Sequence, residues 1–281
     1  MVTDTITTVT VTDTVTVVRV RSQSNLRKTT HDLTRCDFHS HILPKIDDGS
    51  TSSAESADML EMLSKQGVET VCLTPHYYHH RESINDFLRR RNRSVDGLHR
   101  EIERRGNGHK LPTVLVGAEV KVESDLINEN KIKELCFSGT NSLLMEMPFV
   151  GLESRTVETM ENIAFKYDLK IVIAHLNRYL DILSKDDLER VIGIPNSVIQ
   201  MNAEAFKNRK LRKYIIKLLE AEVPIVLGSD AHGIKDRKPE IESAYSVLEE
   251  KLSQHGMHVL SKTQRYLLEG ATEGGIFGYA Y

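Results

Sequence analysis

Residues 37–49 read DFHSHILPKIDDG, and this stretch carries the first sign of both the fold and its chemistry. The residues Cys36–Ser40 favour a β-strand, in which successive side chains point to alternate sides. His39 and His41 therefore point to the same side, and both imidazoles can reach one metal ion. The motif ends in two acids and a glycine. A histidine pair alone is a weak signal, so the prediction depends on the rest of the chain.

The same order of a short β-rich run, a polar end and a helical segment recurs from Cys36 onwards. The predicted strands are Cys36–Ser40, Val68–Thr74, Thr113–Glu119, Ser142–Met147, Lys170–His175, Ser197–Asn202 and Val223–Ser229. The predicted helices are Ser53–Gln66, Ile84–Arg105, Arg155–Tyr167, Lys185–Ile192, Arg209–Ala221, Glu240–Ser253 and Lys262–Leu268. Strands that alternate with helices pair in parallel through crossovers, which predicts the α/β class.

Polar residues that can bind metal end six of the seven predicted strands. These five histidines and four acids are His39, His41, His76, His175, His232, Asp48, Glu119, Glu146 and Asp230. In a parallel barrel all strand ends meet on one face, whereas an open sheet would spread them along an edge, so a closed or nearly closed barrel is favoured. One tetrahedral site needs about four ligands, so this set suffices for two or three ions with shared carboxylates. Oxygen ligands suit Mn²⁺ or Fe²⁺ as well as Zn²⁺.

Each of these residues also has an ordinary structural explanation. A histidine at a strand end is often hydrogen-bonded in a core or loop, and an aspartate there often caps the next helix. Six strand ends that agree in order would require all of these explanations to coincide. We expect structural roles for the remaining histidines, although two of them follow His76 closely and could face a substrate. They are His79 and His80, and the others are His31, His99, His109, His255 and His258.

Two arginines follow predicted ligands closely. Arg178 lies three residues after His175, and Arg237 lies five after His232. A guanidinium beside metal ions binds phosphate oxygens bidentately and stabilises transition-state charge; the alternative is an exposed salt bridge of little energetic weight. A further run, Arg89–Arg93, lies within a helical pattern. We expect a solvated helix face there, with a docking patch for an acidic protein or another subunit as the alternative.

The composition is that of an ordinary globular chain, 40% apolar and 27% charged. The net charge of -3 gives no reason to expect nucleic acid or an anionic membrane as a partner. No apolar run is long enough to insert into a membrane, and no signal-peptide core is apparent. Three cysteines far apart, Cys36, Cys72 and Cys136, predict reduced thiols in a cytoplasmic protein.

Residues 1–35 differ from the rest of the chain. From Thr3 to Val18, threonine and valine alternate almost without interruption, a pattern that could form an edge strand. The stretch is low in complexity and leads into a basic run, so we expect a flexible or mis-assigned N-terminal extension. Residues 36–281 contain no internal repeat or linker and are predicted to form a single domain.

With these motifs, the sequence resembles the polymerase-and-histidinol-phosphatase (PHP) superfamily, and within it the bacterial protein-tyrosine phosphatases of capsule and exopolysaccharide loci. The resemblance covers about residues 36–270, and its motifs are DFHSHILPKIDDG, TPH, GAE, LLMEM, IAHLNRY and GSDAH followed by DRKP. It implies a distorted seven-stranded, TIM-like β/α barrel that holds three metal ions, usually manganese.

The resemblance also implies a role for each motif residue. One ion would take His39, His41, Glu119 and Asp230; a second would take Glu119, Glu146 and His175; the third would take Asp48, His76 and His232. Arg178 and Arg237 fall at phosphate-contacting positions. A tyrosine autokinase of polysaccharide export is implied as the phosphotyrosine-bearing partner, and association into a homo-oligomer is common in such proteins.

These residues predict a phosphatase in which a hydroxide bridging the metal ions attacks phosphorus and a phenolate leaves. A phenol has a pKa of about 10, so an aryl phosphate needs little help from a general acid. No cysteine lies in a C-x₅-R loop, which argues against a thiol-based phosphatase. The alternatives are a small-molecule phosphatase of the histidinol-phosphatase type, a repair nuclease, which the acidic balance disfavours, and a non-catalytic metal-stabilised interaction module.

Overall fold

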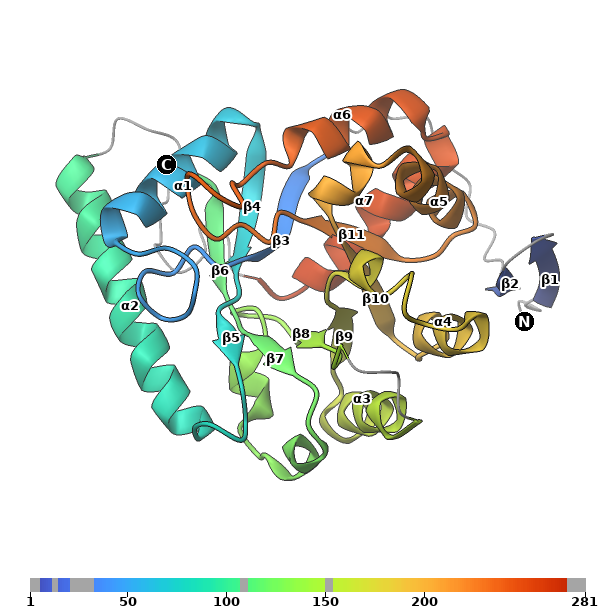
Figure 1. The fold of residues 1–281 in the computed structure, drawn as a ribbon, viewed down its shortest axis with the longest axis horizontal. Coiled ribbons are helices and arrows are strands. Elements are labelled where there is room, and N and C mark those ends of the chain that lie inside the picture. Colours follow the sequence, from blue (N-terminus) through green and yellow to red (C-terminus); the bar gives the residue numbers. More distant parts are fainter. Residues whose placement is uncertain (1–5, 12–14, 21–32, 107–110, 150–153, 272–281) are drawn as a thin grey trace.

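The structure is a computed structural model and describes residues 6–11, 15–20, 33–106, 111–149 and 154–271. Strands alternate with outer helices from Arg35 onwards (Figure 1). The strands of this part are β3 (Arg35–Ser40), β4 (Val68–Leu73), β5 (His76–Tyr77), β6 (Thr113–Val116), β7 (Glu119–Lys121), β8 (Ser142–Glu146), β9 (Lys170–Ile173), β10 (Ser197–Asn202) and β11 (Ile225–Gly228). The α-helices are α1 (Ser53–Lys65), α2 (Ile84–Arg105), α3 (Ser154–Tyr167), α4 (Lys185–Ile192), α5 (Arg209–Glu220), α6 (Glu242–Lys251) and α7 (Gln254–Leu268).

The strands pair in parallel in two sheets. One has the order β3-β4-β6, and the other has the order β11-β10-β9-β8-β7-β5. The predicted α/β class with parallel pairing is therefore confirmed. The predicted closed barrel is not confirmed by this pairing, because the strands of the described residues divide between these sheets.

The division occurs where the predicted strand Thr113–Glu119 breaks into β6 and β7. Gly117 lies at this break, and a Cβ there would lie 2.9 Å from a ring carbon of Phe137, so a larger residue would not fit. Beyond the break, the Glu119 amide donates to the Pro75 carbonyl at 3.0 Å. The shift brings Glu119 into register with His76 of β5.

The helix α7 starts eight residues earlier than predicted, at Gln254 instead of Lys262. The Ser253 hydroxyl caps its first turn by accepting a hydrogen bond from the Gly256 amide at 3.1 Å. Short 3₁₀ helices that the sequence patterns did not predict follow several strands; they are η1 (Ser124–Asn128), η2 (Ile132–Leu135), η3 (Leu176–Arg178) and η4 (Ala203–Lys207). These turns lack the 3.6-residue period that marks an α-helix.

The prediction of a solvated face for the arginine run of α2 is wrong at one position. Arg89 and Arg93 are exposed, but Arg91 is buried. Its Nη1 donates to the Gly117 carbonyl at 3.0 Å, and its guanidinium lies 5.7 Å from the Phe87 ring centroid. Burial lowers its pKa to about 10. Arg91 thus supports the backbone two residues before Glu119.

The core consists of a large cluster between strands and helices and a smaller cluster formed mainly by strand residues. All three cysteines are free and buried, as predicted. Burial raises the pKa of Cys36 and Cys136 to about 12, which makes these thiols inert packing groups. Within the described ranges, no helix combines the length and apolar character needed to cross a membrane.

The N-terminal alternation of threonine and valine forms a hairpin and not a lone edge strand. β1 (Ile6–Val11) pairs antiparallel with β2 (Val15–Val20), with Ile6 opposite Val20. The basic run that follows, and His31, lie outside the described residues. The expectation of an extension separate from the domain stays a prediction.

Candidate metal centre

All nine predicted ligands lie at or just beyond the carboxyl ends of strands. Their ligand atoms form three groups, each within 4.8 Å: His39, His41 and Glu119; His76, Glu119 and Glu146; and His41, Asp48, His76 and His232. The other two predicted ligands contact these groups. Asp230 Oδ1 lies 3.7 Å from His39 Nε2, and His175 Nε2 lies 3.4 Å from Glu146 Oε1. The predicted convergence of strand ends is therefore present in the structure.

Glu119 lies at the centre of the cluster. Its Oε2 is 3.3 Å from Nε2 of both His39 and His41 and 2.9 Å from His76 Nδ1, while its Oε1 is 2.9 Å from His175 Nε2. Burial alone would raise the pKa of this carboxyl, but the surrounding histidines hold it well below its usual value. Glu119 is thus an ionised acid shared by four imidazoles.

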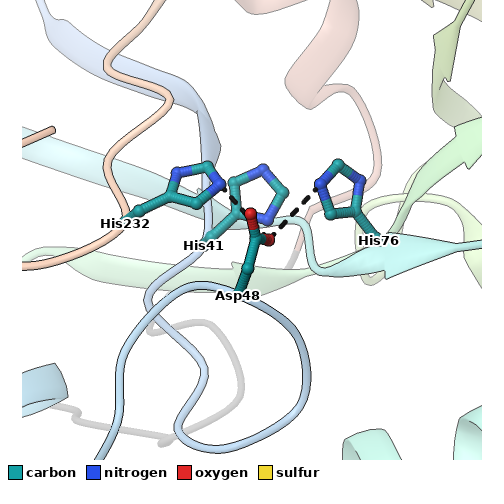
Figure 2. A group of neighbouring side chains, drawn as sticks. All are labelled: His41, Asp48, His76 and His232. Carbon is teal, nitrogen blue, oxygen red and sulfur yellow. Dashed lines mark ion pairs between the residues drawn. The ribbon is translucent and has the colours of Figure 1, made fainter.

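Asp48 closes the outer side of the cluster, as Figure 2 shows. Asp48 lies on the loop that follows β3, and its Oδ1 is 3.6 Å from His76 Nε2 and 3.5 Å from His232 Nε2. The His41 ring lies behind it, with its centroid 4.0 Å from that of His232. Burial and the neighbouring cationic groups lower the pKa of His232 to about 4, which keeps this imidazole neutral and able to bind a metal.

The unmatched polar atoms fit metal ions. Three of the seven buried side-chain atoms that make no hydrogen bond in the described part of the chain belong to predicted ligands: Glu119 Oε2, His76 Nδ1 and His175 Nδ1. Glu119 Oε2 and His76 Nδ1 lie 2.9 Å apart, but their orientation does not give a hydrogen bond. Buried polar atoms without partners are rare, and the adjacent pair of Glu119 Oε2 and His76 Nδ1 points to a ligand that satisfies both. Imidazole nitrogens and carboxylate oxygens suit Mn²⁺, Fe²⁺ or Zn²⁺. The donor set of this cluster therefore fits divalent cations.

Two residues that sequence analysis did not select hold the histidines in place. Asp47 Oδ2 lies 2.7 Å from His41 Nδ1 and accepts a hydrogen bond from the His76 amide at 3.0 Å. Gln200 Oε1 lies 3.0 Å from His39 Nδ1 and accepts from the His175 amide at 2.6 Å. Such partners fix the tautomer and orientation of ligand imidazoles.

A weak signal for both was present in the sequence. Asp47 is the first acid of the Asp-Asp-Gly motif, and Gln200 is a polar residue inside the one predicted strand without a ligand. Burial lowers the pKa of His41, but the Asp47 and Glu119 carboxylates outweigh it and raise the pKa to about 10. The pKa of Asp47 is lowered to about 2, because the His41 partner outweighs burial.

The two predicted arginines reach the cluster through Asp230. Arg178 Nη2 and Arg237 Nη2 each lie 2.5 Å from one oxygen of this carboxylate, and Arg237 Nη1 donates to His232 Nε2 at 2.9 Å. The side chains are 29% and 41% exposed, so they join the buried cluster to solvent. Both arginines thus form salt bridges, as the alternative expected, but with a carboxylate that is only 3% exposed and that contacts the cluster.

Three site residues have left-handed backbone conformations. The φ angles are 31° at His175, 52° at Asp230 and 45° at Arg237. Such conformations cost on the order of 1–3 kcal/mol for residues other than glycine and persist only where the surroundings fix them. The fold therefore holds these side chains in place against local preference.

Aromatic rings border the cluster beside His175. The Phe149 ring stacks on Tyr179 with centroids 4.9 Å apart, and it also lies 6.0 Å from the His175 ring. Phe149 is 49% exposed, so one side of this stack faces solvent. His79 Nδ1 contacts the Tyr77 hydroxyl.

His79 and His80 are the two histidines that could face a substrate. His80 lies 2.7 Å from Glu123, and neither histidine belongs to the three ligand groups. His99 and His255 each lie near a glutamate, Glu103 and Glu222. Structural roles thus fit these histidines, and His109 lies outside the described residues.

The comparisons with known proteins agree with this geometry. A family profile described as capsular polysaccharide synthesis, CpsB/CapC, matches residues 35–268. Tyrosine-protein phosphatase YwqE of Bacillus subtilis (strain 168) is 27% identical over 244 residues, which cover 84% of this chain and 92% of that protein. The putative tyrosine-protein phosphatase CapC of Staphylococcus aureus is 29% identical over 213 residues, covering 72% of this chain and 78% of that protein.

The fold is also similar to a solved structure. It comes from a study of YwqE from Bacillus subtilis and CpsB from Streptococcus pneumoniae, described as unique metal-dependent tyrosine phosphatases. The TM-score is 0.67 at 24% identity, over 84% of this chain and 95% of the other. At this identity, the match establishes a shared fold.

Proposed function

This chain belongs to the CpsB/CapC family of capsular polysaccharide synthesis, and we propose that it is a metal-dependent protein-tyrosine phosphatase. The observation that carries the proposal is the shared carboxylate of Glu119, which lies within 3.3 Å of four imidazoles beside two arginines. The names of the relatives, YwqE and CapC, support the same activity and give no support to the small-molecule alternative.

The proposed ligand sets are those that the family resemblance implies, and the groups in the structure support them in part: there His76 lies with Glu119 and Glu146, and His41 lies with Asp48. One ion would be held by His39, His41, Glu119 and Asp230, a second by Glu119, Glu146 and His175, and a third by Asp48, His76 and His232. Mn²⁺ is the proposed metal, with Fe²⁺ or Zn²⁺ as alternatives for the same donors. Bound ions of this kind lower the pKa of water to about 7 and offset phosphoryl charge.

The side chains around the cluster bind and orient the substrate. Arg178 and Arg237 can turn from Asp230 toward phosphoryl oxygens, which a guanidinium binds bidentately. The exposed side of Phe149 offers a stacking surface for the phenyl ring of phosphotyrosine. Since phenolate is a good leaving group with a pKa of about 10, the absence of a dedicated acid among the described site residues is compatible with this substrate.

We propose that the strands close into the predicted barrel between β3 and β11. The His41 amide donates to the Ala231 carbonyl at 2.8 Å, and the Asp230 amide donates to the His39 carbonyl at 2.7 Å, so β3 borders the end of β11. The smaller apolar cluster takes residues from β3, β4, β6, β8, β9, β10 and β11. These contacts support a distorted seven-stranded barrel. An experimental structure in which the β3 and β11 ends lie apart would overturn the closure.

The biological setting also remains a proposal. The partner would be a phosphotyrosine-bearing protein, with a tyrosine autokinase of polysaccharide export as the specific candidate. The three free cysteines support a cytoplasmic location, since reduced thiols persist there. Residues 36–281 as one domain and a homo-oligomer are retained as predictions. Sedimentation of the full chain and of a truncated chain, residues 36–281, tests whether these residues fold alone and whether the protein associates.

Turnover experiments test the activity. Purified protein is loaded with Mn²⁺ and given phosphotyrosyl peptide, phosphoseryl peptide and histidinol phosphate, then assayed again after chelation. We expect preferential hydrolysis of the phosphotyrosyl peptide and loss of this activity with the metal. Turnover that survives the chelator, or equal rates on the seryl peptide, would contradict the proposal. A preference for histidinol phosphate would establish the small-molecule alternative.

A further inference from the structure

A cavity of about 310 Å³ adjoins the cluster of predicted ligands at Asp230. Five basic and three acidic side chains line it, which makes its lining positive on a chain with a net charge of -3. Arg178 and Arg237 form its inner part, where both contact Asp230. Three lysines, Lys207, Lys235 and Lys238, contribute the other positive charges. The cavity is therefore a place where anions concentrate.

The inner and outer parts of this cavity differ in how their charges are matched. Asp230 offsets the arginines of the inner part, and Glu240 pairs with Lys207 at 2.9 Å. Lys235 and Lys238 are exposed, and no ion pair joins them to any residue that the structure describes, although Lys235 lies near enough to Glu55 to help lower the pKa of that carboxyl. Glu204 is the remaining acid of the lining. The two lysine charges exceed the single charge of Glu204, so the outer part keeps a net positive charge that a ligand can meet.

We propose that Lys235 and Lys238 form an accessory subsite for a second anionic group on the substrate protein, near the phosphotyrosine in its sequence. The inference rests on the proposed phosphatase function. A phosphoryl group held by the inner arginines places the neighbouring residues of its peptide over the outer part of the same cavity. A lysine ammonium is a point charge on a flexible stem, so it accepts a carboxylate or a second phosphate in many orientations. The subsite thus selects substrates with clustered negative charge.

Equilibrium binding and kinetics on the full chain test this subsite. The probes are peptides of equal length with a non-hydrolysable phosphotyrosine mimic and neutral neighbours, acidic neighbours or a neighbouring phosphoserine. The matching phosphotyrosyl peptides and p-nitrophenyl phosphate serve for turnover. The variant is Lys235→Gln with Lys238→Gln. The control is Lys213→Gln with Lys217→Gln, which removes the same charge from exposed positions of α5.

We expect the subsite variant to raise Kd and KM by about 2- to 10-fold for the peptides with a second anion, since two exposed ion pairs are lost. The value of kcat, and the Kd and KM of the neutral peptide and of p-nitrophenyl phosphate, should stay unchanged. The difference should shrink at high salt. The acidic and phosphoserine peptides separately report which anion is preferred.

Two results would overturn the subsite. Equal Kd values for the variant and the parent on every peptide would remove it. An equal loss on p-nitrophenyl phosphate would place the lysines in the phosphate site itself. A protein that binds the anionic peptides through these lysines but turns over no phosphotyrosyl substrate would refute the phosphatase proposal and leave the subsite standing.

Discussion

The inner and outer sides of the cluster are built differently. The inner group, which comprises His39, His41, Glu119 and Asp230, is at most 3% exposed. The outer group of the cluster comprises Asp48 and the two arginines that form the inner part of the adjoining cavity, Arg178 and Arg237. Their side chains are 66%, 29% and 41% exposed. Inner residues are oriented by further buried hydrogen bonds, such as that from Asn202 Nδ2 to Asp230 at 2.9 Å. We infer that the inner group fixes the metal positions, whereas the outer group exchanges partners during binding.

The largest expected effect comes from the centre of the inner group. Glu119→Gln keeps the shape of the side chain but removes the charge that four imidazoles share. We expect metal content and phosphatase activity to fall by more than the roughly 100-fold that marks the upper range for supporting residues. Metal analysis and turnover on a phosphotyrosyl peptide measure the loss.

The control for this substitution is Glu123→Gln. It makes the same chemical change four residues further on, where the carboxylate pairs with the partly exposed His80. This control should keep its metal and its activity. If Glu119→Gln behaved like Glu123→Gln, Glu119 would not be the shared ligand.

The second-largest expected effect comes from Asp47, which orients His41, and it distinguishes Asp47 from its neighbour Asp48. Asp47→Asn weakens the hydrogen bond to His41 Nδ1, now 2.7 Å long, and leaves the amide free to adopt the wrong orientation. Metal affinity or activity should fall by about 10- to 100-fold, the usual range for a residue that orients a ligand. A Mn²⁺ titration monitored by activity measures this. An unchanged titration would mean that burial alone orients His41.

The same comparison explains how far the sequence could predict the structure. The alternation of short strands and helices, and the acids and histidines at six of the seven strand ends, follow from local pattern and can be predicted residue by residue. Gln200 was not selected, because its role depends on the neighbours of β10, which only the fold brings to His39 and His175. Arg91 was misplaced for the same reason, since the four arginines of the run Arg89–Arg93 give no local sign of which one is buried.

The third effect is smaller and lies on the outer side. Asp48→Asn makes the same change as Asp47→Asn at the next residue, but the Asp48 side chain is 66% exposed and lies 3.5 Å or more from its two histidines. Solvent screens this charge, and the amide oxygen can still act as a ligand. We expect a loss of less than about 10-fold, recovered by added Mn²⁺. A loss larger than that of Asp47→Asn would reverse the assignment of inner and outer roles.

The smallest effect tests the ring that borders the cluster. Phe149→Ala removes a half-exposed ring that stacks on Tyr179 at an interplanar angle of 10°. An aromatic pair contributes about 0.5–1.5 kcal/mol beyond area burial, so kcat/KM for a phosphotyrosyl peptide should fall by about 2- to 10-fold. Hydrolysis of an alkyl phosphate, which has no ring to stack, should not change, and the ratio of the two rates is the diagnostic quantity.

Phe165→Ala is the matched control, because Phe165 is 91% exposed on α3 and contacts none of the ligand groups. It should leave both rates unchanged. An equal loss of aryl and alkyl hydrolysis in Phe149→Ala would mean that the ring supports His175, 6.0 Å away, and does not bind substrate. In that case Phe149 would belong with the inner group, which fixes metal positions, although its own side chain is half exposed. The aryl-to-alkyl ratio therefore decides on which side of the site this ring acts.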